Sequence, residues 1–71
     1  MDGLTASIAH ELNQPLTAIL SNLQGLARLL SEGNLKPALV SAAVRHTIED
    51  TKRAAEIVRR LRSMFKSDET P

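Results

Sequence analysis

Apolar residues recur at alternating intervals of four and three along two segments of the chain, and this spacing limits the fold to packed helices. In the first segment the positions are Leu12, Leu16, Ile19, Leu23, Leu26 and Leu30. In the second the same spacing gives Val40, Val44, Thr47, Thr51, Ala54, Val58, Leu61 and Phe65, and its two threonines make this stripe less apolar than the first. Such a repeat keeps side chains on one side of an α-helix, as in coiled coils and helical bundles. The sequence therefore predicts an all-α fold built from two helices.

The segment between the repeats, SEGNLKP, is typical of a short turn between helices. Gly33 suits the position just after a helix, and Pro37 suits the first turn of the next one. We expect a single domain over residues 1–71, with helix 1 over about 3–32, a turn over about 33–37, helix 2 over about 38–66 and a frayed tail at 67–71.

The length of the chain predicts that the two-helix hairpin needs a partner. A chain of 71 residues has a marginal core of its own, and this one has no cysteine for a disulfide and a single aromatic residue. An antiparallel hairpin alone would leave part of each apolar stripe in water. We therefore expect a homodimer in which two hairpins form a four-helix bundle.

Charge and hydropathy argue against two other classes of function. Net charge is +1, and the seven basic residues between 38 and 66 are mixed with three acidic ones and with no stacking aromatics, which disfavours nucleic-acid binding. Polar residues interrupt the apolar stretch LTAILSNLQGLARLL, so we expect no membrane contact from this segment. Without a secretion signal, a cytoplasmic location is expected.

The stretch IAHELNQPLTAI, residues 8–19, carries the candidate chemistry. At about 100° per residue, His10 lies about 160° from the centre of the first apolar stripe, so it should face solvent. Gln14 and Thr17 share that outer face, and Glu11 flanks the stripe. A zinc site is excluded because Gln14 stands where the metalloprotease pattern needs a second histidine. His46 lies off the second stripe, and we assign it no role.

The string SIAHELNQPLTAI resembles the H-box of sensor histidine kinases, within their dimerisation and histidine-phosphotransfer (HisKA-type) domain. Its NQPL form is similar to the branch of oxygen-sensing and dicarboxylate-sensing kinases. The later RAAEIVRRLRSMFK looks like the end of the second helix of that domain, so the resemblance covers nearly the whole chain.

The resemblance implies roles for the matching residues. His10 would accept the γ-phosphoryl group of ATP on Nε2 and pass it to an aspartate in the receiver domain of a response regulator. Glu11 would act as the base that orients the imidazole. The commonest H-box has Thr or Asn four residues after the histidine to position water for dephosphorylation, whereas this chain has Gln14 there, which leaves phosphatase activity open.

Pro15 is the unusual residue of the motif, because proline inside a helix removes a hydrogen bond to the carbonyl four residues earlier, here that of Glu11. We expect a bend just after His10. Two interpretations stay open: the bend is a hinge that controls access to His10, or it only shapes the bundle.

The resemblance also implies partners that this chain does not contain. It carries no glycine-rich loop, so we expect no cofactor on it, with ATP and Mg bound by a separate ATP-binding domain. The chain would then be a fragment of a sensor histidine kinase that is inactive with ATP alone, either cytoplasmic outright or the cytoplasmic part of a membrane-bound sensor. Residues expected to face the regulator are Ser7, Gln14, Thr17 and Ser21.

The sequence leaves two questions open. The handedness of the turn decides whether phosphorylation runs within a protomer or across the dimer, and neither is favoured. The alternative to phosphotransfer is a purely structural homodimeric bundle in which His10 has no chemical role.

Overall fold

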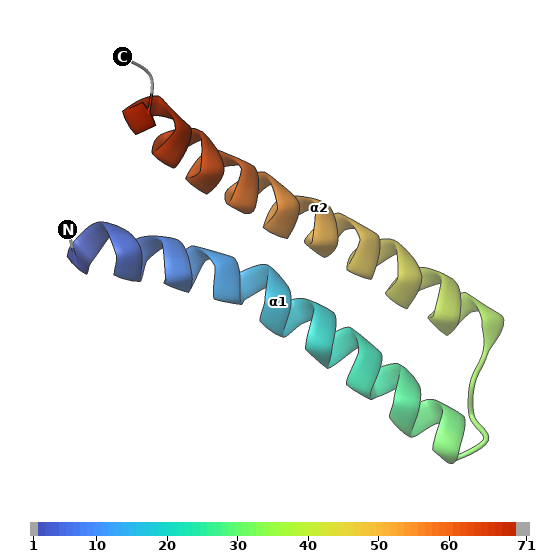
Figure 1. The fold of residues 1–71 in the computed structure, drawn as a ribbon. Helices are drawn as coiled ribbons and strands as arrows, with labels where there is room; N and C mark the ends of the chain where they lie inside the picture. Colours follow the sequence, from blue (N-terminus) through green and yellow to red (C-terminus); the bar gives the residue numbers. More distant parts are fainter. Residues whose placement is uncertain (1, 70–71) are drawn as a thin grey trace.

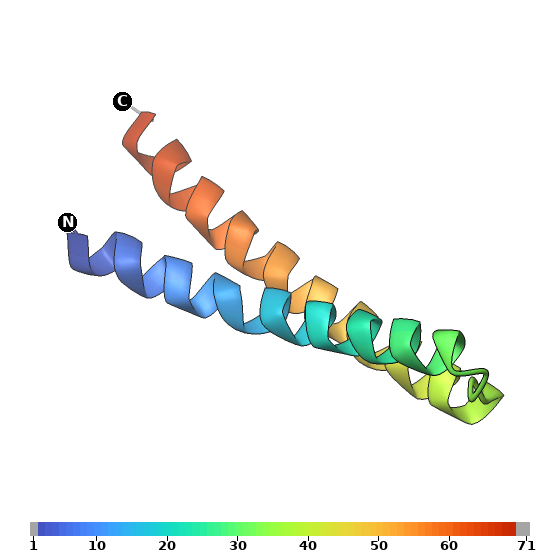
Figure 2. The same ribbon diagram turned by 90° about the horizontal axis from the view of Figure 1, so that it is seen from below.

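The chain is a hairpin of two long helices in a computed structural model that describes residues 2–69, with side chains described for residues 6–65. Helix α1 spans Asp2–Ser31 and helix α2 spans Pro37–Glu69. They run antiparallel, as Figure 1 shows, in a molecule of 58 × 20 × 12 Å. Figure 2 shows that the two helices are inclined to one another. The predicted all-α hairpin is confirmed, and residues 2–69 include no strand.

The turn ends α1 by a specific hydrogen-bonding pattern. Gly33 has a φ of 73°, the left-handed conformation that glycine adopts without steric cost. Its N–H donates to the Leu30 carbonyl at 3.2 Å, and the Asn34 N–H donates to the Leu29 carbonyl at 2.9 Å. These two bonds form a Schellman motif, which satisfies carbonyls left free at the end of a helix. Pro37 is the first residue of α2, where its missing N–H costs nothing.

Helix α2 is longer at its C-terminus than the sequence predicts. The expected end at residue 66 and the frayed tail at 67–71 are wrong for residues 67–69, which continue the helix to Glu69. Residues 67–69 include no glycine or proline, so no helix-breaking residue ends α2 before Glu69. The remaining two residues of the predicted tail, 70 and 71, lie outside the described residues.

The 4-3 repeat of each helix divides between a half-buried edge and an exposed edge, as expected for a hairpin that leaves part of each apolar stripe in water. On α1, Leu12, Ile19 and Leu26 are half-buried, whereas Leu16, Leu23 and Leu30 are exposed by 47% or more. Steps of four and three residues turn about 40° and 60° in opposite directions around a helix, so the two sets of repeat positions lie on adjacent edges and can face different neighbours. The hairpin therefore buries one edge of the stripe and leaves the other edge exposed.

Helix α2 shows the same division. Its repeat positions alternate between half-buried residues toward α1 and exposed residues away from it. The half-buried ones are Val40, Thr47, Ala54 and Leu61, and the exposed ones are Val44, Thr51, Val58 and Phe65. We call the exposed repeat residues of both helices the outer apolar face. The best-buried side chains are instead Ile57, at 6% exposure, and Pro15, at under 2%.

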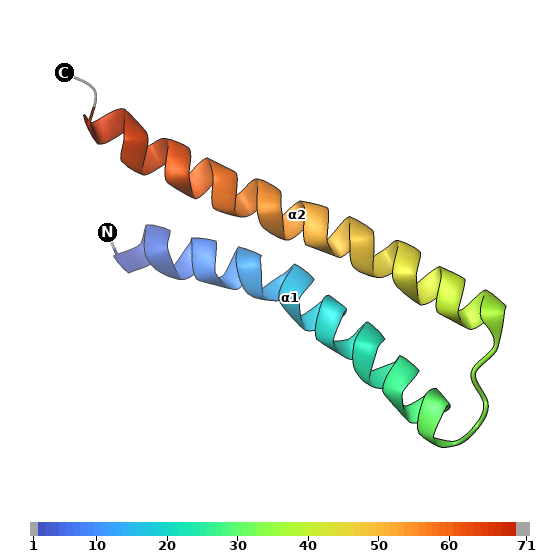
Figure 3. The same cartoon turned by 45° about the vertical axis from the view of Figure 1, so that its right-hand side comes forward.

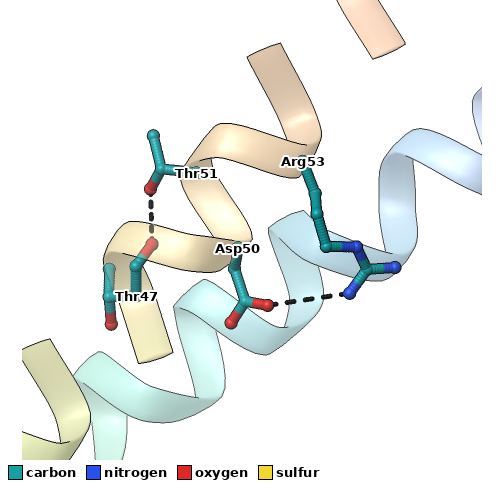
Figure 4. A network of polar contacts seen from close by, with 4 residues as sticks. All are labelled: Thr47, Asp50, Thr51 and Arg53. Carbon is teal, nitrogen blue, oxygen red and sulfur yellow. Dashed lines mark hydrogen bonds and ion pairs between the residues drawn. The ribbon is translucent and has the colours of Figure 1, made fainter. Parts of the chain in front are cut away.

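Polar groups interrupt the middle of the hairpin interface (Figure 4). The Asp50 side chain is only 16% exposed and lies 3.7 Å from the guanidinium of Arg53 on the same helix. The Thr47 hydroxyl is buried without a hydrogen-bond partner, while the Thr51 hydroxyl donates to the Thr47 carbonyl at 2.7 Å. An unpaired buried hydroxyl costs free energy, so the middle of the hairpin is held less firmly than a fully apolar interface would be.

Gly25 and Gly33 have different backbone conformations, and replacing each by alanine gives a matched test of this fold. Gly33→Ala should lower the free energy of unfolding by about 1 kcal/mol, because alanine is strained at a positive φ. Gly25→Ala should raise it by about 1 kcal/mol, because Gly25 lies inside α1 with open space around a Cβ. Urea unfolding followed by circular dichroism measures both. Destabilisation by both variants, or by neither, would contradict the turn described above.

Candidate functional site

His10 lies on the part of α1 that is far from the turn, in the blue segment of Figure 1, and its side chain is exposed. It projects about 120–140° round the helix from Leu16 and Leu23 of the outer apolar face. A partner that covers that face would therefore leave the imidazole open to solvent. The predicted exposure of His10 is confirmed.

Gln14 is the one described side chain with a polar contact to His10. Its Nε2 lies 3.4 Å from Nε2 of the imidazole, one helical turn away. Donation from the Gln14 amide requires a lone pair on His10 Nε2, so the proton of the neutral ring would then be on Nδ1. This arrangement places Gln14 beside the ring nitrogen that could act as a nucleophile.

Glu11 does not contact His10 but reaches across the hairpin. The Arg60 guanidinium on α2 donates to its Oε2 at 2.9 Å, and both side chains are about half exposed, Arg60 by 55% and Glu11 by 47%. The structure therefore brings Glu11 together with Arg60, a residue that the sequence interpretation did not single out. The sequence gives only a coarse indication of this pairing, because residues at similar distances from the turn lie near each other in an antiparallel hairpin.

Pro15 packs inside the hairpin, one turn after Glu11. It lies within an unbroken α1 and is under 2% exposed. Figure 3 shows α1 changing direction between its blue and its cyan parts, around residues 10–20. Proline bends helices because its ring displaces the preceding turn, which accounts for a bend at this place. The expected bend is present, and the burial of the ring ties it to the packing against α2.

The other candidate contact residues are also exposed. Ser7, Thr17 and Ser21 are open to solvent on α1, as is His46 on α2. Of the seven basic residues of the second half, the described ones are Arg45, Lys52, Arg53, Arg59, Arg60 and Arg62, and all are exposed. Arg59 pairs with Glu56 on its own helix.

An open groove of about 240 Å³ lies between the helices beside this region. Glu11 and Arg60 line it together with apolar side chains, among them Ile8, Ile57 and Leu61. The ion pair thus has water on one side and hydrocarbon on the other.

Residues 2–69 hold no cluster of three or more His, Cys, Asp or Glu that could bind a metal ion. Neither α1 nor α2, over the residues described, is long and apolar enough to cross a membrane.

Comparison with known proteins gives one family and two informative relatives. The model of the family described as "His Kinase A (phospho-acceptor) domain" matches residues 1–70. The chain is 43% identical over 68 residues to "Sensor histidine kinase TmoS" of Ectopseudomonas mendocina, covering 93% of the chain and 7% of that protein. It is 39% identical over 72 residues to "Sensor protein FixL" of Bradyrhizobium diazoefficiens, covering 99% of the chain and 14% of that protein. The chain thus spans a small part of either relative. No solved structure matches it.

Replacing Pro15 by alanine tests what the bend costs. The variant regains the hydrogen bond to the Glu11 carbonyl and loses two buried ring methylenes, so the free energy of unfolding should rise by about 1–2 kcal/mol. Urea unfolding at a fixed chain concentration measures this. A loss of stability would instead show that packing of the ring against α2 outweighs the backbone cost.

Proposed function

The chain belongs to the His Kinase A (phospho-acceptor) domain family, and from this premise we propose that His10 is its phosphoacceptor. The observation that carries the proposal is the exposed imidazole of His10, whose Nε2 is the ring nitrogen beside Gln14. Phosphoryl transfer depends mainly on in-line positioning, and an exposed ring can meet a donor and an acceptor in turn.

The proposed reaction has two steps. Nε2 of His10 attacks the γ-phosphorus of ATP, a P–N bond forms, and the P–O bond to ADP breaks. The carboxylate of an aspartate in a receiver domain then attacks the same phosphorus and returns the lone pair to the imidazole. ATP and Mg are bound by a separate ATP-binding domain, so this chain supplies the acceptor and the docking surface of a kinase but is inactive with ATP alone.

The neighbours of His10 have supporting roles in this proposal. Glu11 is the base that accepts the proton of the ring and orients it, which requires its carboxylate to turn from Arg60 toward His10. Gln14 lies beside Nε2, and in this proposal it would orient a water molecule for dephosphorylation of the regulator. The regulator docks near His10, over the exposed side chains of Ser7, Thr17 and Ser21. The domain acts in the cytoplasm, where ATP is available.

The outer apolar face supports a homodimer. A folded monomer of 7.7 kDa should expose about 4,300 Å² by the usual scaling with mass, whereas this chain exposes 5739 Å². The excess is of the size that one chain buries in a stable dimer. Thr51 fits such an interface because its hydroxyl is already satisfied by the Thr47 carbonyl. Two hairpins joined by this face form a four-helix bundle that leaves His10 uncovered.

Labelling with phosphoramidate tests the phosphoacceptor without requiring an ATP site. Mass spectrometry should locate an acid-labile phosphoryl group on His10, and added receiver domains should remove it. His10→Gln should lose the label, whereas His46→Gln, the matched change at the other exposed histidine, should keep it. Equal labelling in the His10→Gln variant, or a label that no receiver accepts, would favour the purely structural bundle.

A charge on the outer apolar face tests the dimer. Leu23→Glu, at a side chain 49% exposed in the hairpin, should abolish the dimer in analytical ultracentrifugation and lower the helix content, because a carboxylate would be buried without a partner. Thr17→Glu, about 120° from Leu23 around the same helix, should leave the dimer intact. Dimerisation of the Leu23→Glu variant would contradict the proposed interface.

A further inference from the structure

Arg60 holds the carboxylate of Glu11 away from His10. Its guanidinium lies 2.9 Å from Glu11 Oε2 and forms the one polar side-chain contact between α1 and α2 among residues 6–65. The other described side-chain bonds and ion pairs stay within one helix. This contact therefore fixes the direction of Glu11 from the other helix.

Helix geometry makes the two directions of Glu11 exclusive. Adjacent residues project about 100° apart, and side chains at i and i+1 do not face each other. Glu11 points into the groove toward Arg60, while His10 points outward. To reach the imidazole the carboxylate must leave Arg60 by a change of rotamer.

Arg60 is the one donor bonded to the Glu11 side chain among residues 6–65, although the Ser7 hydroxyl also lines the groove. The groove beside it is lined largely by apolar side chains, including Ile8, Ile57 and Leu61. The contact is opened by competition for the Arg60 guanidinium, whose planar fork of donors suits carboxylates. An acidic group of a bound partner, or a movement of α2 along α1, would supply that competition.

We propose that Arg60 is the positioning residue that decides whether Glu11 is available to His10. With Arg60 bound, Glu11 is withheld; with Arg60 drawn away, the carboxylate can accept the Nδ1–H of His10 and leave the Nε2 lone pair free. The effect on phosphorylation rests on the proposed function of His10. The effect of Arg60 on Glu11 and the imidazole can be tested in the unphosphorylated chain.

The test measures the tautomer of His10 by ¹⁵N chemical shifts of the ring, at about pH 8.5, where an ordinary imidazole is neutral. In Arg60→Gln the freed Glu11 should change the ratio of Nδ1–H to Nε2–H tautomers about two- to tenfold in favour of Nδ1–H, as one net hydrogen bond would. Arg60→Lys, which keeps the charge, should resemble the original chain. Arg59→Gln is the matched control, since Arg59 pairs with Glu56 on its own helix.

A double variant separates the freed carboxylate from the lost positive charge. If Glu11 causes the change, Glu11→Gln combined with Arg60→Gln should return the ratio to its original value. An unchanged ratio in Arg60→Gln, or a change that persists in the double variant, would overturn the proposal. Because no phosphoryl donor is used, the tautomer ratio is independent of whether His10 accepts a phosphoryl group. Circular dichroism verifies that each variant keeps its helices.

Discussion

The width of the apolar stripe on each helix is the constraint on which the rest of the structure depends. Apolar residues beside the 4-3 repeat, such as Leu20, Ile48 and Met64, widen each stripe and stay exposed in the hairpin, so one neighbouring helix does not cover the whole stripe. Packing within the hairpin uses Leu12, Ile19 and Leu26 of α1, and leaves Leu16 and Leu23 exposed. In the proposed dimer both apolar edges are packed, and the remaining side of α1 is free to carry exposed polar residues.

The turn determines which residues meet at the far end of the hairpin. The Schellman bonds at Gly33 and Asn34 fix where α1 stops, and Pro37 fixes where α2 starts. With both helices rigid, that start sets the register over the whole length and brings Arg60 opposite Glu11. A one-residue change in the turn would therefore rotate Arg60 away from Glu11, even though the turn lies far from His10.

Pro15 links the packing of the hairpin to the candidate site. Its ring is among the most deeply buried groups, and the Glu11 carbonyl it frees lies next to His10 in the chain. The bend thus starts at the turn of helix that carries His10 and Glu11. A change in how α2 packs against Pro15 would alter the bend and would first displace His10 and Glu11. This displacement is how the bend could act as a hinge.

Local features of the sequence were enough to predict the helices, the turn and the outward direction of His10. Helical periodicity and turn chemistry depend on residues that are neighbours in the chain. Only the tertiary structure decided which edge of each stripe faces the other helix, how deeply Pro15 and Asp50 are buried, and that Glu11 pairs with Arg60. These depend on how α2 is rotated and displaced against α1. That placement is set by side-chain packing between residues distant in sequence, which periodicity within one helix does not encode.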